Sequence, residues 1–309
     1  MWKEIIWAVD PYQKDKKVWN HSLAMTQFLA TKTNASIQPV YISTPAELRL
    51  MTSYEIPSQR RMHDVSLRDV TSALKKVKVK NLKKPQVVVN RKAFSTTEAV
   101  ETLSRYASRS NAALLVIGTH SKTGLQRFFL GSFAETLLYH AKTPVLLLGP
   151  KMKKKAEIKK ILFATDFSKE SRRVYDCLLT FASSTGAQVH LINVVEDATR
   201  WANPFDSMMA GEGSALLEGA IRDQIKASQK KLQKWADDAK GMKVKTSFSV
   251  ERSLDKIGDV ILKKAKAQSA DMIAIGTQSG PVRATLGSVA RHIVRRSELP
   301  VWIAPRHAS

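Results

Sequence analysis

Ile117–Val145 reads IGTHSKTGLQRFFLGSFAETLLYHAKTPV, and Ile275–Val301 reads IGTQSGPVRATLGSVARHIVRRSELPV. The two stretches share Ile-Gly-Thr at the start, Leu-Gly-Ser in the middle and Pro-Val at the end. One offset of 156 residues relates three pairs of anchors: Gly131 and Gly287, Pro144 and Pro300, and Asp10 and Asp166. A repeat of this length indicates a duplicated domain. We therefore expect a first domain at residues 1–150, a basic linker at 151–156 and a second domain at 157–309.

The composition favours a globular protein with two cores. Of the 309 residues, 43% are hydrophobic, which is enough for two domains of about 150 residues to bury their own cores. The single cysteine, Cys177, excludes a disulfide within the chain, and its helical surroundings predict a buried structural thiol. No apolar run is long enough to cross a bilayer, and the first residues lack the pattern of a secretory leader. The sequence thus predicts a cytoplasmic protein with no membrane partner.

The charge is strongly basic, with 50 Lys and Arg against 27 Asp and Glu and a net charge of +23. The excess is spread over both halves, with local concentrations at Lys75–Lys80 and in the linker from Lys151. Spread charge attracts polyanions in general without specifying one. No basic run interleaved with aromatic residues and no DNA-reading motif accompanies it, so the charge favours solubility and general anion attraction over a dedicated nucleic-acid site. Nucleic acid remains the less favoured partner on this reasoning.

Short apolar runs alternate with helical patterns in each half. The expected strands are residues 5–9, 37–42, 87–89, 114–117 and 145–148, then 161–164, 189–195, 245–250, 272–275 and 301–304. The expected helices include residues 19–29, 97–108, 174–181, 217–235 and 256–266. Such alternation predicts parallel strands covered by helices on both faces. The fold class is therefore α/β, with two tandem doubly wound domains that each contain a five-stranded parallel sheet.

In doubly wound sheets the ligand crevice lies beyond the carboxyl ends of the strands. Asp10 and Asp166 end the first strands of the two halves, and Gly118 and Gly276 end the fourth strands. In the first half a helix is expected to begin at Ser132, which forms a capping-box pattern with Glu135. The free N–H groups and partial positive charge of a helix N-terminus suit a phosphate group. We therefore expect the anionic end of a ligand near residues 118–132.

The spacing of the glycine loop resembles the nucleotide loop of the universal stress protein family. That loop follows the fourth strand and reads Gly, two residues, Gly, nine residues, then Gly-Ser or Gly-Thr. The segments Ala164–Ser168, Leu191–Val195 and Ala270–Gly276 also match the family, and the resemblance covers essentially the whole chain. It implies an adenine nucleotide alpha hydrolase-like fold, in the tandem form of the family. It also implies ATP or a related adenine nucleotide as ligand, with or without Mg, and a role in the stress response.

In the first half, the resemblance assigns the nucleotide site residue by residue. Val9 and Asp10 would border adenine and ribose, and Ile42 would lie beside adenine. The sugar and phosphates would be surrounded by Gly118, His120, Ser121, Gly131, Ser132 and Phe133. Lys122 and Arg127 would add positive charge, although these two and His120 can also be read as solvated loop residues. Ser121 replaces the second glycine of the pattern, which costs about 1 kcal/mol if that position needs a positive φ.

The second half departs from the pattern in a different way. Its loop is two residues shorter, and Arg291 stands three residues beyond Ser288, where a capping-box acid is expected. A possible second site, degenerate by this reasoning, would comprise Thr165, Asp166, Val194, Gly276, Ser279, Gly287 and Ser288. The better phosphate site is therefore expected in the first half, and a structural role is expected for the second.

No motif supports catalysis beyond slow hydrolysis of bound ATP. The chain contains no Gly-x-x-x-x-Gly-Lys-Ser/Thr loop, and its seven histidines show no metal-ligand spacing, so no metal site is expected. The leading hypothesis is a nucleotide switch that alters contacts with an unknown protein partner. The alternative is a nucleotide-free interaction scaffold. In the family the fifth strands pack together, so we expect residues 145–148 and 301–304 to pair within the chain and mimic a dimer, with further homodimer formation left open.

Overall fold

The structure, a computed structural model, describes residues 2–13, 15–45, 58–93, 95–118, 141–149, 152, 156–197, 211–276 and 287–304. In the first half the elements are β1 (Glu4–Ala8), α1 (Lys16–Thr33), β2 (Ser36–Ser43), α3 (Gln59–Leu74), β3 (Gln86–Val89), α4 (Thr96–Arg109), β4 (Leu114–Gly118) and β5 (Val145–Leu148). In the second half they are β6 (Lys160–Ala164), α6 (Lys169–Thr185), β7 (Gln188–Glu196), α8 (Gly211–Lys240), β8 (Thr246–Ser253), α9 (Ile257–Ala267), β9 (Met272–Gly276), α10 (Ser288–Arg296) and β10 (Val301–Ala304).

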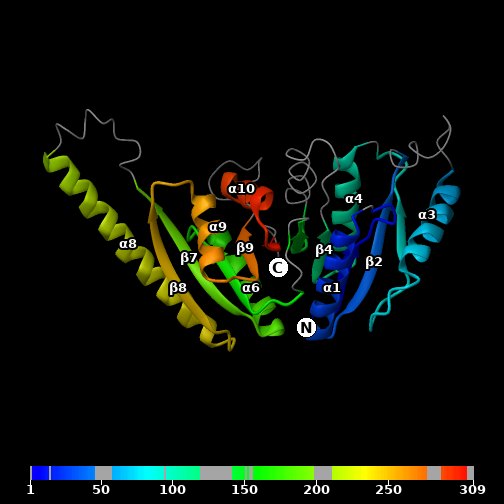
Figure 1. Ribbon diagram of the computed structural model, residues 1–309, viewed down its shortest axis with the longest axis horizontal. Helices are drawn as coiled ribbons and strands as arrows, with labels where there is room; N and C mark the ends of the chain where they lie inside the picture. The colour runs from blue at the N-terminus through cyan, green and yellow to red at the C-terminus, as the bar shows by residue number, and fades with distance from the viewer. Residues whose placement is uncertain are drawn as a thin grey trace.

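The ten strands form one sheet in the order β3-β2-β1-β4-β5-β10-β9-β6-β7-β8. Within each half every neighbouring pair of strands is parallel, which confirms the predicted α/β fold with five parallel strands per half. The halves meet where β5 and β10 pair antiparallel, with Val301 opposite Leu147 and Ile303 opposite Val145. The expected contact between the two fifth strands is therefore present. Figure 1 shows the halves side by side, with β2 and β8 far from this seam, and the two edges of the sheet are β3 and β8.

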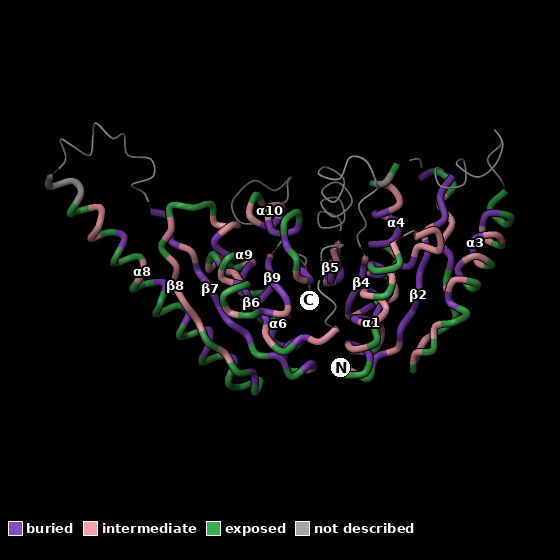
Figure 2. The backbone as a smooth tube through the Cα atoms, viewed as in Figure 1, coloured by how far each residue is buried: buried purple, intermediate pink, exposed green. Residues whose placement is uncertain are grey.

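Helices cover both faces of the sheet and divide the buried side chains into two layers. One layer packs the sheet against α1, α3, α6 and α8, and the other packs it against α4, α9 and α10. Both layers include residues of both halves, and Figure 2 shows the buried strands running between more exposed helices. None of the helices in the described part of the chain combines the length and apolarity needed to cross a membrane.

Local sequence explains most of the element boundaries. Ser95 and Glu98 form a full capping box at the start of α4, and Ser168 caps α6 by accepting a hydrogen bond from the Ser171 backbone N–H at 3.0 Å. Gly186 ends α6 with φ of 74°, a conformation that glycine adopts at no steric cost. β8 runs to Ser253, three residues beyond the expected end, because it pairs with the whole of β7 as far as Glu196.

Aromatic side chains pack at the seam between the halves. The Trp302 ring of β10 is 1% exposed and lies 6.0 Å from the Phe181 ring of α6, measured between centroids. The Phe181 ring lies 5.4 Å from the ring of Trp2, which precedes β1. Large aromatic rings contribute strongly to buried cores. The seam is thus held by side-chain packing as well as by the β5–β10 hydrogen bonds.

Cys177 lies on α6 and is partly buried. Burial, helped by the nearby Asp176 carboxylate, raises the pKa of its thiol to about 11. A thiol with such a pKa is almost wholly protonated at neutral pH and therefore a poor nucleophile. These properties agree with the predicted structural role.

A partly buried polar network lies between β7, β8 and α9. His190 on β7 makes hydrogen bonds to Ser247 Oγ through Nδ1 at 2.8 Å and to Ser249 Oγ through Nε2 at 3.1 Å. Lys264 on α9 pairs with Glu251 on β8 at 2.5 Å. Burial lowers the pKa of His190, and the positive charges of Lys264 and Lys160 lower it further, against a smaller opposite effect of Glu251. The lowered pKa therefore favours the neutral form of His190 in the folded protein.

We expect the free energy of unfolding to fall as the pH drops below about 6.5, the ordinary pKa of His190. In that range the unfolded chain binds a proton more readily than the folded chain, in which the pKa of His190 is lowered. His190→Gln removes this contribution, so its stability should depend less on pH between about 7 and 5. Urea denaturation at several pH values measures the free energy of unfolding of both proteins. If the difference in that free energy between wild type and His190→Gln stays constant from about pH 7 to 5, His190 does not cause the pH dependence.

Candidate functional site

The predicted site residues that the structure describes lie at the carboxyl ends of three adjacent strands in each half. In the first half these are Val9, Asp10, Ile42 and Gly118, at β1, β2 and β4. In the second half the corresponding ends of β6, β7 and β9 place Thr165, Asp166, Val194 and Gly276, with Gly287 and Ser288 at the start of α10. His120, Ser121, Lys122, Gly131, Ser132, Phe133 and Ser279 lie outside the described residues, as do Arg127 and Glu135.

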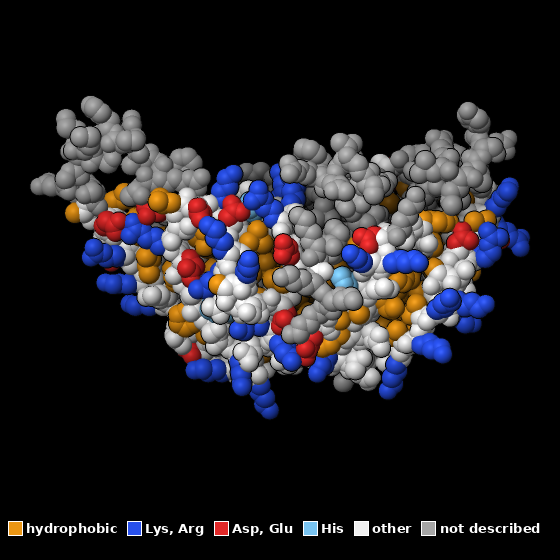
Figure 3. Space-filling view, in the orientation of Figure 1, with side chains coloured by type: hydrophobic (Ala, Val, Ile, Leu, Met, Phe, Trp, Pro, Cys, Tyr) orange, Lys and Arg blue, Asp and Glu red, His pale blue; other side chains and the backbone are white. Residues whose placement is uncertain are grey.

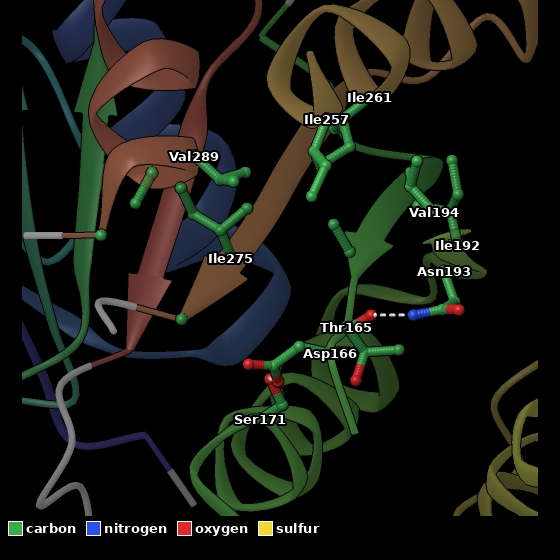
Figure 4. A pocket seen from close by; sticks show the side chains of 14 residues that line it. Thr165, Asp166, Ser171, Ile192, Asn193, Val194, Ile257, Ile261, Ile275 and Val289 are labelled. Carbon is green, nitrogen blue, oxygen red and sulfur yellow. Dashed lines mark hydrogen bonds between the residues drawn. The ribbon is translucent and has the colours of Figure 1, made fainter. Parts of the chain in front are cut away.

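A pocket is formed in the second half. Its lining includes five of the predicted residues of the second site, Thr165, Asp166, Val194, Gly276 and Gly287. Figure 4 shows two different walls. The side chains of Ile192, Val194, Ile257 and Ile261, with Ile275 and Val289 opposite, line an apolar slot. Thr165, Asp166 and Ser171 form a polar side. The pocket thus offers an apolar surface next to hydrogen-bonding groups.

The carboxylate of Asp166 is fixed by the first turn of α6. Its Oδ1 accepts hydrogen bonds from Ser171 Oγ at 2.5 Å, Ser168 Oγ at 2.7 Å and the Ser168 backbone N–H at 3.0 Å. Burial by itself raises the pKa of Asp166, but these hydrogen bonds outweigh it and leave the pKa below its ordinary value. Asp166 is therefore a charged acceptor at neutral pH, because hydrogen bonds to the ionised form stabilise it.

The turn that carries Asp166 contains an unusual backbone conformation. Phe167 has φ of 61°, in the left-handed region that bulky residues seldom adopt. Its backbone N–H donates to Thr165 Oγ1 at 3.0 Å. Its ring packs edge-on against Trp235 of α8, at 5.8 Å between centroids, and Lys231 Nζ lies 5.1 Å from the ring centroid. Contacts with α8 thus stabilise a strained turn at the edge of the pocket, where such strain tends to accompany function.

Sequence reasoning missed several residues of the pocket. Asn193 interrupts the apolar run of β7, and its Nδ2 donates to the backbone oxygen of Thr165 at 2.8 Å, so it ties β7 to the end of β6. A polar asparagine inside an apolar strand was the feature of the sequence that could have indicated a site at Asn193. Ser171 looks like an ordinary residue of a helix in the sequence. Ile257 and Ile261 belong to α9, far along the chain, so only the tertiary structure reveals them as part of the apolar slot.

The start of α10 differs from the expected arrangement. Gly287 is the N-cap, without a side-chain hydrogen bond, and Ser288 is the first helical residue. Ser288 is therefore not the cap, so Arg291 does not occupy the place of a capping-box acid. The first turn contains no acidic residue. The N-terminus of α10, at the Gly287 side of the pocket, thus keeps its partial positive charge unopposed by a carboxylate in that turn.

The first half positions its aspartate differently. Asp10 Oδ1 accepts a hydrogen bond from the Tyr12 backbone N–H at 2.9 Å, which is a local turn. The next helix begins only after its N-cap Asp15, five residues beyond Asp10, whereas Ser168 stands two residues beyond Asp166. Asp10 is consequently not held by hydroxyl groups of the following helix cap as Asp166 is.

Over the described residues of both halves, no cluster of three or more His, Cys, Asp or Glu is arranged to hold a metal ion.

Gly118 and Gly276 are equivalent in sequence but not in packing. A Cβ atom at Gly118 would lie 2.8 Å from Cγ1 of Val18, because β4 packs directly on α1 at this point. A Cβ atom at Gly276 would lie 3.6 Å from Cγ2 of Val174, which is an ordinary contact. Close packing of β4 against α1 therefore already accounts for the glycine at 118, without a ligand.

Gly118→Ala should lower the free energy of unfolding by about 1–3 kcal/mol, because the added methyl group overpacks against the stiff side chain of Val18. Gly276→Ala is the matched control and should cost well under half as much. Urea denaturation of both variants measures the contrast. Equal losses would show that close packing against Val18 is not the cause.

The fold and this site can be compared with known proteins. A model of the universal stress protein family matches residues 1–149 and again residues 157–305. The chain therefore belongs to the universal stress protein family, with the family domain present twice. A universal stress protein of Methanocaldococcus jannaschii is 40% identical over 76 residues, which are 25% of this chain and 44% of that protein. The match thus spans less than half of that relative's length.

Solved structures share the fold over the whole chain. A universal stress protein from Archaeoglobus fulgidus has a TM-score of 0.63 at 18% identity, with 98% of each chain covered. A functionally unknown protein from Pseudomonas aeruginosa has a TM-score of 0.61 at 16% identity, covering 99% of this chain and 93% of that one. At these identities the likeness shows that the tandem architecture is shared.

Proposed function

We propose that this universal stress protein binds an adenine nucleotide, ATP or a related one, in the pocket of the second half. The observation that carries the proposal is the Asp166 carboxylate, held ionised by Ser168 and Ser171 beside an apolar slot. A base would fit between the isoleucine side chains, and ribose hydroxyl groups would donate to Asp166. Well-formed apolar pockets with a few convergent polar groups are typical ligand sites.

The phosphates would lie at the N-terminus of α10. Backbone N–H groups at the start of this helix have no partner within the helix, and its first turn lacks an acidic residue. Such a site needs no metal ion held by protein side chains, and any Mg²⁺ would be bound through the phosphates of the nucleotide. A universal stress protein from Archaeoglobus fulgidus has been solved in complex with dAMP, at 19% identity over 47% of this chain. The proposal rests on the pocket of this chain, and that relative indicates only that a family member takes such a ligand.

The sequence favoured the first half, and this prediction stays open because the glycine loop there lies outside the described residues. A second nucleotide in the first half would use Val9, Asp10, Ile42 and Gly118 at the strand ends. The bound nucleotide would act as a switch in the stress response, without catalysis beyond slow hydrolysis. The seam between β5 and β10 would let one chain stand in for a dimer of single domains, as sequence analysis suggested.

Asp166→Ala should weaken ATP binding at least about tenfold, because a hydrogen bond to a charged group contributes roughly 1.5–3 kcal/mol. Isothermal titration calorimetry measures the affinity and the number of sites. Asp10→Ala is the matched variant of the first half. It should leave the affinity unchanged if only the second half binds, and it should remove one of two sites if both halves bind.

Two results would overturn the proposal. If neither the wild type nor the variants bind ATP, ADP or AMP, the alternative of a nucleotide-free scaffold applies. If Asp166→Ala binds as tightly as wild type while Asp10→Ala does not, the nucleotide belongs to the first half, as the sequence had favoured. Thermal unfolding without ligand provides the control that each variant is folded.

A further inference from the structure

The outer face of α8 carries a row of positive charges that the nucleotide site does not use. Four residues spaced by four positions, Arg222, Lys226, Lys230 and Lys234, form this basic row, and all four are exposed. The opposite face of α8 packs into the core through Leu232, Trp235, Ala236 and Ala239. Figure 3 shows Lys and Arg side chains along the outer margin of the molecule where α8 lies. From end to end the row spans about 18 Å, at roughly 1.5 Å per residue of a rigid helix.

Three acidic groups near the basic row are already engaged, whereas the exposed Asp223 lies next to Arg222 on the same helix. Asp238 pairs with Arg172 at 2.5 Å, and Asp237 pairs with Lys240 at 2.7 Å. Glu218 is held by Arg252, at 2.8 Å to Nη1. No member of the row forms an ion pair with another described residue. Like charges four positions apart on a helix repel each other, so the row destabilises α8 locally instead of supporting it.

The equivalent helix of the first half lacks this arrangement. On α3 the cations alternate with acids, and ion pairs join Arg60 to Asp64 and Arg68 to Asp69. Both helices occupy the same place in the duplicated fold, between the second and third strands of their halves. The fold itself therefore does not require the basic row, and a helix without it serves the same structural purpose.

We propose that the basic row of α8 binds the phosphate backbone of double-stranded nucleic acid without reading its sequence. A duplex presents evenly repeated negative charges along its backbone. The row offers cations along the outer side of α8, turning about 120° around the helix axis from Arg222 to Lys234. The exposed Gln229 and Gln233 lie beside the cations, and amide side chains are common donors to phosphate oxygens. Leu216 near the start of α8 is 76% exposed, but among the described residues from Ala220 to Lys240 no large apolar side chain is exposed, so the part of α8 that carries the row does not suit insertion into a membrane.

A four-site variant tests the proposal: Arg222→Gln, Lys226→Gln, Lys230→Gln and Lys234→Gln. Fluorescence anisotropy with a labelled duplex DNA of random sequence, over a range of salt concentrations, measures the affinity and its salt dependence. The logarithmic slope of affinity against salt should become shallower by up to about 3.6, or 0.9 for each phosphate that the variant no longer neutralises. Affinity at low salt should fall at least about tenfold. The variant should unfold at a temperature no lower than wild type, because mutual repulsion is removed.

The matched control removes four charges elsewhere: Lys75→Gln, Lys76→Gln, Lys78→Gln and Lys80→Gln, all exposed in the wild type. Its salt slope should stay close to that of wild type. If both variants lose affinity equally, net charge alone is responsible and the proposal fails. It also fails if the α8 variant binds duplex like wild type, or if wild type binds vesicles of phosphatidylserine and phosphatidylcholine but not the duplex. Asp166→Ala should bind duplex normally, which separates this surface from the nucleotide pocket.

Discussion

The antiparallel pairing of β5 with β10 is the interaction on which the rest of the structure depends. Both strands consist of apolar residues, and all four residues of each are buried. Without the pairing, each strand would be an apolar edge of its sheet exposed to solvent. Pairing satisfies their backbone groups and joins two five-stranded sheets into one. Because both core layers continue across the seam, the position of each half relative to the other follows from this contact.

Duplication has given the chain two equivalent frameworks with different details at their strand ends. Asp166 is held by the hydroxyl groups of a helix cap that follows at once, whereas Asp10 sits in a longer turn. Gly118 is required by close packing on α1, whereas Gly276 has room around it and lines a pocket. Gly118 and Gly276 thus differ in their packing although they are equivalent in sequence.

Helix α8 connects several of these features. Its buried side contributes Trp235, whose ring packs against Phe167 and Tyr175, and so stabilises the strained turn beside the pocket. Arg172 of α6 lies 5.3 Å from the Trp235 ring centroid and pairs with Asp238 of α8. The helix is therefore firmly attached on one side while its other side presents the basic row. A rigid support of this kind keeps the charges of the row in fixed positions.

The sequence alone determined the duplication, the strand and helix order, the parallel halves and the strand ends where site residues gather. These follow from local periodicity and from a repeat with a constant offset, which need no tertiary information. Only the tertiary structure decided which residues line the pocket. Ile257, Ile261 and Ser171 come from separate elements, and their approach to Asp166 depends on how helices pack on the sheet. It also decided that Asp238 and Glu218, near the basic row, are engaged by Arg172 and Arg252, which lie far away in the chain.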